Sequence, residues 1–107
     1  MGDMKSKILE EISQEMSLSV DTLIEKGVEI FLRERRKRLK LDILSILGRY
    51  DVSSSGELEG KIRAGEIKEH PAWEDLVVVE NLEAALRKID GYLEALSRAS
   101  SSSDREV

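Results

Sequence analysis

Apolar residues recur at helical spacing over most of the chain. In residues 5–16 they stand one, three and four positions apart, on one face of a helix: Ile8, Leu9, Ile12 and Met16. A polar S-L-S turn follows, in which Ser19 suits the N-cap of a second helix and Asp21 lies in its first turn. The pattern predicts helices over about 5–16 and 20–47, joined as a helical hairpin.

The second predicted helix carries one cation within an otherwise apolar stripe. The stripe contains Val20, Ile24, Val28, Phe31, Arg35, Leu39, Ile43, Ile46 and Tyr50. A cation there should pair with a carboxylate or an aromatic face, because an unpaired charge in an apolar seam is costly. Past Leu39 the helix is apolar on two sides and therefore needs two neighbours. We place Arg35, Leu39 and Ile43 at an interface with a partner or a second copy.

Local capping signals predict a short third helix. Ser54 and Glu57 have the spacing of a capping box, which indicates a helix over about 56–64. Gly65 can end that helix in the left-handed conformation, since glycine adopts a positive φ at little cost.

A fourth helix is predicted from Pro71, a residue favoured at the first helical position, to about residue 97. Its apolar residues follow a heptad-like spacing: Val79, Leu82, Leu86, Ile89, Leu93 and Leu96. The run L-V-V-V at 76–79 alone would also suit a buried strand, but the length of the surrounding pattern favours helix. The serine-rich residues 98–107 predict a disordered tail.

These elements predict one all-α domain of four helices over residues 1–97. A length of 107 residues suits a single domain. Only 4 % of the residues are aromatic, so the core should be thin, and small chains of this kind often gain stability by association. We therefore expect a homodimer or a higher oligomer.

The residue types argue against an enzyme and against a bound cofactor. The chain has no cysteine and one histidine, His70, which precedes Pro71 and suits a cap or turn. Nucleophilic catalysis needs a nucleophile beside a base, and a metal site here would need carboxylates that converge. The segment G-E-L-E-G at 56–60 lacks the strand and lysine of a phosphate-binding loop. We expect no catalytic residue, no metal ligand and no cofactor.

The sequence also predicts a cytoplasmic protein that does not enter a membrane. No apolar run approaches the roughly 20 residues that a membrane-spanning helix needs. The start, M-G-D-M-K-S-K, lacks the apolar region of a signal peptide. The absence of cysteine fits a reducing compartment.

Positive charge is concentrated in residues 33–40, R-E-R-R-K-R-L-K, although the whole chain has a formal charge of −5. Helical spacing places four of these cations on one outer face: Arg33, Arg36, Lys37 and Lys40. Three roles remain open for this face. It can be solvated and paired within the chain, as in Glu29–Arg33, it can bind phosphate, or it can dock on an acidic protein surface.

Trp73 is the only tryptophan and lies at the start of the fourth predicted helix. It can anchor the core, or it can be a hot spot for a partner, since tryptophan is enriched at such positions. The candidate partner or oligomer interface on this helix combines it with the heptad positions: Trp73, Val79, Leu82, Leu86, Ile89 and Leu93.

The first two predicted helices contain I-L-E-E-I-S-Q-E-M-S-L-S-V-D-T-L-I-E-K-G-V-E-I-F-L-R-E-R, with a polar turn and a small residue at Gly27. This segment, Ile8 to Arg35, resembles the helix pair of ribbon-helix-helix regulators, which include many antitoxins of prokaryotic toxin–antitoxin pairs. The resemblance implies dimerisation through the helix pair. The N-terminal strand with which such regulators read DNA is missing, because only residues 1–7 precede the helix and their apolar residues do not alternate. The rest of the chain, through P-A-W-E-D, looks like small archaeal proteins of antitoxin type.

The leading hypothesis is a non-enzymatic, antitoxin-like protein that dimerises and binds a partner protein, with a nuclease toxin as the partner that the resemblance implies. One alternative is a DNA-binding regulator that contacts phosphates through the basic helix 33–40. Another is a structural subunit of a larger complex.

Overall fold

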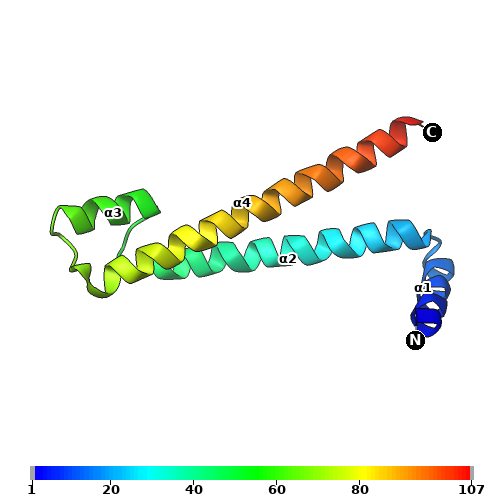
Figure 1. Cartoon of the computed structure of the whole chain (residues 1–107), viewed down its shortest axis with the longest axis horizontal. Coiled ribbons are helices and arrows are strands. Elements are labelled where there is room, and N and C mark those ends of the chain that lie inside the picture. Colours follow the sequence, from blue (N-terminus) through cyan, green and yellow to red (C-terminus); the bar gives the residue numbers. More distant parts are fainter. Residues whose placement is uncertain (1, 107) are drawn as a thin grey trace.

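The computed structural model describes the backbone of residues 2–106 and the side chains of residues 3–100. It contains four helices, namely α1 (Gly2–Met16), α2 (Val20–Gly48), α3 (Ser55–Arg63) and α4 (Glu69–Glu106) (Figure 1). Over residues 2–106 there is no strand, and residues 76–79 lie within α4. The all-α fold of four helices that the sequence predicted is therefore confirmed.

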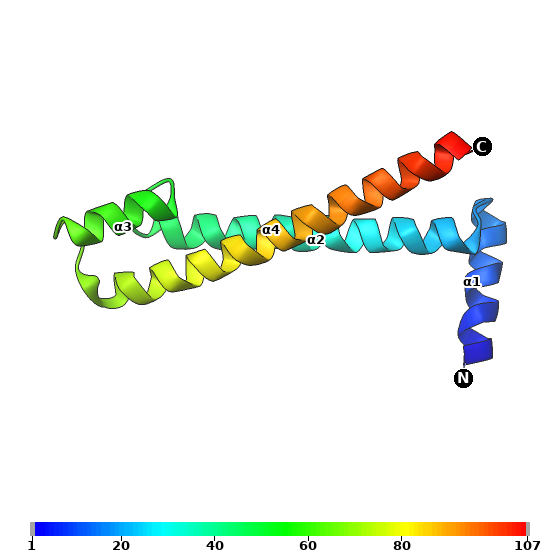
Figure 2. The same ribbon diagram turned by 45° about the horizontal axis from the view of Figure 1, so that its top comes forward.

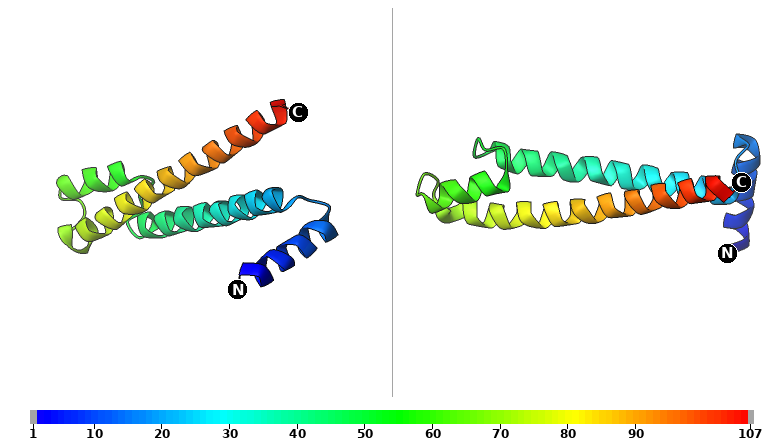
Figure 3. Two further views of the ribbon diagram at one scale, coloured as in Figure 1. Left: turned by 45° about the vertical axis from the view of Figure 1, so that its right-hand side comes forward. Right: turned by 90° about the horizontal axis from the view of Figure 1, so that it is seen from above.

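The helices form an elongated molecule with principal extents of 61 × 34 × 19 Å. Helices α2 and α4 run in opposite directions and pack along each other, and α3 packs on α4 at the closed end of this hairpin (Figure 2). Helix α1 contacts α2 and projects sideways at the other end, where the ribbons of α2 and α4 separate (Figure 3, left). The prediction that the first two helices form a hairpin was therefore wrong, since the hairpin consists of α2 and α4. One end of the molecule is thus three helices thick, and the other end is open.

The hydrophobic core lies entirely at the closed end. The buried apolar side chains come from the second half of α2, the following loop, α3 and the start of α4: Leu39, Ile43, Ile46, Leu47, Val52, Leu58, Ile62, Ala72, Leu76 and Val79. Among the described side chains, α1 contributes none to this core and buries only Ser13, whose hydroxyl donates to the Glu10 carbonyl at 2.9 Å. The first third of the chain therefore folds without a core of its own.

The face of α2 that meets α4 differs from the predicted stripe. Leu39 and Ile43 are buried, but within the chain and not at the interface with a partner or a second copy that the sequence predicted. Phe31 and Arg35 are exposed, and Arg36 takes the inner position through an ion pair with Asp90 of α4. The placement of Arg35 in the seam and of Arg36 on the outer face was therefore wrong. Two sets of positions on α2 follow helical spacing, the predicted set 31, 35 and 39 and the observed set 32, 36, 39 and 43. Only the position of α4 selects the observed set.

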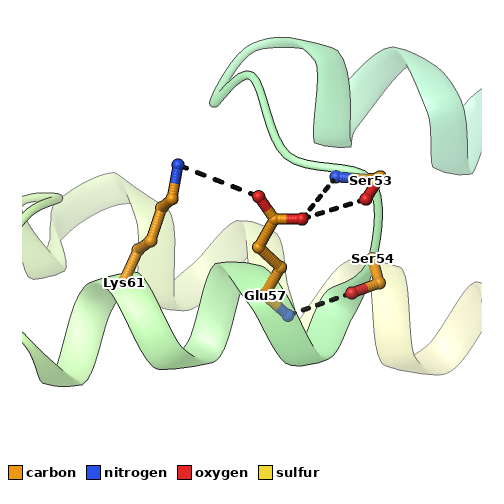
Figure 4. Close-up of polar contacts among 4 residues, drawn as sticks. All are labelled: Ser53, Ser54, Glu57 and Lys61. Carbon is orange, nitrogen blue, oxygen red and sulfur yellow. Dashed lines mark hydrogen bonds and ion pairs between the residues drawn. The ribbon is translucent and has the colours of Figure 1, made fainter.

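Helix α3 begins at the predicted capping box (Figure 4). The Glu57 backbone N–H donates to Ser54 Oγ at 3.0 Å. The Glu57 carboxylate accepts from the backbone N–H and the hydroxyl of Ser53 at 3.2 and 2.9 Å, one residue before the expected donor. These two bonds, with a smaller contribution from Lys61, hold the pKa of Glu57 below its usual value. Gly65 follows the helix with φ of +76°, as predicted.

Regular helix in α4 begins at Pro71, as the sequence predicted, because His70 has an extended backbone at φ −112° and ψ 129°. At the other end α4 continues to Glu106, through the serine-rich residues 98–106 for which the sequence predicted disorder. Serine costs less than about 0.7 kcal/mol per residue relative to alanine within a helix, and extending an existing helix needs no new nucleus.

Candidate functional site

Most of the exposed large apolar side chains lie at the open end of the molecule. Eight of them are on α1 and the first half of α2: Met4, Ile8, Ile12, Met16, Ile24, Val28, Ile30 and Phe31. Phe31, the only phenylalanine, is 68 % exposed. Scattered exposed apolar residues are ordinary, but contiguous apolar patches on a small protein mark interaction sites. This surface is the strongest candidate site in the chain.

Helix α1 presents a continuous apolar stripe to solvent. Met4, Ile8, Ile12 and Met16 are four positions apart and are all exposed. Fully burying one such side chain contributes about 1.5–3 kcal/mol of stabilisation. Because the four side chains of this stripe are exposed in the isolated chain, much of that stabilisation would be gained only on contact with another surface.

The joint between α1 and α2 is held by satisfied caps. Ser17 adopts a left-handed conformation with φ of +57° and donates its N–H to the Gln14 carbonyl at 3.2 Å. The Leu18 N–H donates to the Ser13 carbonyl at 2.9 Å, which completes a Schellman motif. Ser19 then caps α2 by accepting from the Thr22 N–H at 3.1 Å. These bonds set the direction in which α1 leaves the hairpin.

The basic residues 33–40 do not form the single outer face that the sequence predicted. Arg33 pairs with Glu29 at 3.0 Å, and Arg36 pairs with Asp90 of α4. Among the side chains of residues 3–100, no carboxylate oxygen lies within 4.0 Å of the other four cations: Arg35, Lys37, Arg38 and Lys40. Arg33 is thus the locally paired cation that the sequence suggested. The bond of Arg36 depends on packing against α4, which local sequence does not reveal.

Part of the predicted partner interface on α4 is used within the chain. Val79 is fully buried, and Leu82 and Leu86 are half-buried against the core. Ile89 and Leu93 are half-buried nearer the open end. The heptad-like positions of α4 therefore contact α2 of the same chain, as an antiparallel hairpin requires.

Trp73 combines features of both predicted roles, since its side chain is partly exposed at the closed end. The Arg63 guanidinium lies 5.7 Å from the centroid of the indole ring, a cation–π contact between α3 and α4. A shallow pocket of about 480 Å³ surrounds this pair, lined by Ile62, Arg63, Glu69, His70 and Trp73. Exposed Val77, one turn further along α4, extends the apolar surface beside the tryptophan.

His70 occupies the turn position that the sequence predicted and contacts Glu74, with 2.7 Å between Nδ1 and the carboxylate. The backbone N–H of Glu74 itself, followed by His70, holds the pKa of the Glu74 carboxyl below its usual value. This exposed pair lies at the start of α4. In the described part of the chain, no three His, Cys, Asp or Glu side chains are grouped closely enough to hold a metal ion.

The Tyr50 hydroxyl donates to the Asp75 carboxylate, and Arg49 lies 3.7 Å from the same carboxylate. Burial, followed by the bond to Asp75 and its negative charge, raises the pKa of Tyr50 to about 12. This cluster ties the end of α2 to the first turns of α4. Local sequence does not reveal this bond, because the two partners are 25 positions apart.

An apolar groove separates α2 from α4 at the open end. It has a volume of about 390 Å³ and is lined by Val28, Leu32, Tyr92, Ala95 and Leu96. The first two residues come from α2 and the other three from α4, so the groove exists only because the two helices diverge.

No helix within the described residues is both long enough and apolar enough to cross a membrane. The model of the Uncharacterized protein MJ0235 family matches residues 4–101 of the chain. No curated protein and no solved structure matches it. The resemblance to ribbon-helix-helix antitoxins therefore stays a prediction.

Proposed function

We propose that this chain, which belongs to the Uncharacterized protein MJ0235 family, is a non-enzymatic, antitoxin-like module that dimerises through α1 and α2 and binds a partner protein. The observation that carries the proposal is the distribution of apolar side chains. Every buried apolar residue among the described side chains lies between Leu39 and Val79, whereas most apolar side chains of α1 and the first half of α2 are exposed and none is buried.

A second protein surface accounts for this distribution better than solvent does. Burial of apolar area is the main favourable term in protein association. The exposed side chains at the open end stand on two helices whose joint is capped, so they are held in place before binding and little ordering entropy is lost.

The closed end of the molecule offers a separate surface for the partner protein. Trp73, Val77 and Val78 are exposed on α4, and Arg63 lies over the indole. Tryptophan and arginine are the residues most enriched at interface hot spots. A nuclease toxin as the partner rests on the resemblance of the helix pair alone.

The dimer is tested by light scattering on the full chain and on two glutamate variants of α2. The 12.1 kDa chain is expected to give about twice this mass at tens of micromolar. Phe31→Glu removes the most exposed aromatic ring of the surface and is expected to weaken the dimer at least about 30-fold, the effect of a 2 kcal/mol hot spot. Leu44→Glu is the matched control, because Leu44 is 62 % exposed on the same helix but lies in the half of α2 at the closed end, outside this surface. A monomeric wild-type chain, or equal effects of the two variants, would contradict the proposed dimer.

DNA binding is the second candidate, and the four cations without a nearby carboxylate favour it: Arg35, Lys37, Arg38 and Lys40. Arg35 and Arg38 lie about 60° apart around α2 and can contact one duplex together, so with two phosphate contacts log K should fall with log salt at a slope of about −1.8 on duplex DNA. The double variant Arg35→Glu with Arg38→Glu should abolish binding, whereas Arg63→Glu at the closed end should leave it unchanged. Undetectable binding at low salt excludes this candidate.

A further inference from the structure

The groove at the open end is uncovered in the isolated chain. Its five lining residues present almost only carbon to solvent, and Tyr92 is exposed on one rim. Phe31 and Ile24 continue the apolar surface on α2, since they lie three and four positions from Val28 and share its side of the helix. A groove between two helices with an apolar floor suits an amphipathic helix, whose side chains fill it at intervals of three and four residues.

The chain itself contains an unused helix of this kind. The stripe of α1 extends from Met4 to Met16, about 18 Å along the helix, and all four of its residues are exposed. Its own groove is not its binding site, because the capped turn at Ser17, Leu18 and Ser19 directs α1 sideways from the hairpin (Figure 1). The stripe and the groove are therefore both vacant in one protomer.

The charges around the two surfaces are complementary. Glu11 and Glu15 lie beside the apolar stripe of α1, and residues 9–16 carry no cation. Arg35 is seven positions from Val28 and Lys88 is four positions before Tyr92, so each extends one wall of the groove towards the closed end. An acidic helix in the groove would give Arg35 the carboxylate that it does not have among the described side chains.

We propose that α1 of a second copy occupies this groove, and that two copies exchange their α1 helices reciprocally around a two-fold axis. This inference rests on the proposed dimer and specifies its geometry. A reciprocal exchange buries both stripes and both grooves at once, and it brings the acidic second half of α1 in each protomer towards Arg35 and Lys88 of the other. It also explains why the first third of the chain lacks a core of its own.

Disulfide trapping tests this geometry directly, because the chain has no cysteine. One chain carries Ile12→Cys, and a second chain, distinguished by a tag, carries Ala95→Cys. After co-expression and mild oxidation we expect a disulfide between the two chains. Two cysteines can be bridged only when their Cα atoms lie within about 7 Å. Ile8→Cys is a second probe on the same stripe, and a disulfide from either probe supports the exchange.

Two control variants test whether the disulfide depends on the position along α4 and on the face of α1. Ala84→Cys lies on nearly the same side of α4 but about 16 Å closer to the core, and Gln14→Cys lies on the polar face of α1. Neither should form the disulfide above background.

The outcomes separate the exchange from the dimer itself. A dimer by light scattering without a disulfide from Ile12→Cys or Ile8→Cys to Ala95→Cys overturns the exchange and leaves the dimer intact. A monomer overturns both. A disulfide within single chains that carry Ile12→Cys together with Ala95→Cys shows that α1 folds back on its own groove, which also overturns the exchange.

Discussion

Val79→Asp is expected to unfold the hairpin of α2 and α4. Val79 is 0 % exposed in the core between α2, α3 and α4. An aspartate there would place an uncompensated charge or a protonated carboxyl without partners among apolar side chains, at a cost of several kcal/mol. Small domains are stable by only about 5–15 kcal/mol, so this loss is a large fraction of the total. Thermal or urea denaturation followed by circular dichroism measures it.

The two preceding valines provide matched controls for this substitution. Val77 and Val78 are 48 % and 44 % exposed on the same helix, and each change to Asp alters helix propensity equally. Relative to Val79→Asp, both controls should therefore remain close to the wild-type stability. Equal destabilisation by all three substitutions would contradict the orientation of α4, because it would mean that burial does not distinguish position 79 from its neighbours.

Leu58→Ala is expected to lower the free energy of unfolding by about 2–5 kcal/mol, the range for leucine truncation in a packed core. Leu58 is 0 % exposed and is the most deeply buried side chain of α3. Its loss leaves a cavity between α3 and the hairpin. Because α3 has nine residues, too few for a stable isolated helix, its order depends on this packing.

Leu44→Ala is the control for the α3 substitution, since Leu44 is 62 % exposed on α2. Urea denaturation should separate the two variants by at least about 1.5 kcal/mol, the difference between the low end of the core range and the usual effect at the surface. If the two alanine variants have the same midpoint, α3 does not pack as the structure shows.

Local signals in the sequence were sufficient for the helices and for most of their ends. Ser19, Ser54, Gly65 and Pro71 mark caps that the structure contains at those positions. Each signal acts through hydrogen bonds or backbone preferences within a few residues, so it can be interpreted without knowledge of the fold. Helix spacing also identified Leu39, Ile43 and Val79 as residues that become buried.

Tertiary packing decided which face of each helix is covered. In α2 the sequence predicted that Arg35 faces the neighbouring helix and that Arg36 points outward. Arg36 also follows helical spacing relative to Leu39 and Ile43, and the position of α4 selected Arg36. The bond from Tyr50 to Asp75 likewise joins residues from separate elements, which no local pattern predicts.

The sequence by itself determined that the chain forms four helices, where most of them begin and end, and that it is rich in paired apolar stripes. Only the tertiary structure showed that the apolar stripes at the closed end are buried within the chain. The stripe of α1 and the groove at Val28 and Tyr92 remain exposed. The physical reason is that the hydrophobic effect favours burial of an apolar stripe but is not directional, so the stripe does not specify which surface covers it. That surface is set by the angle at which α2 and α4 diverge and by the capped turn that directs α1 away.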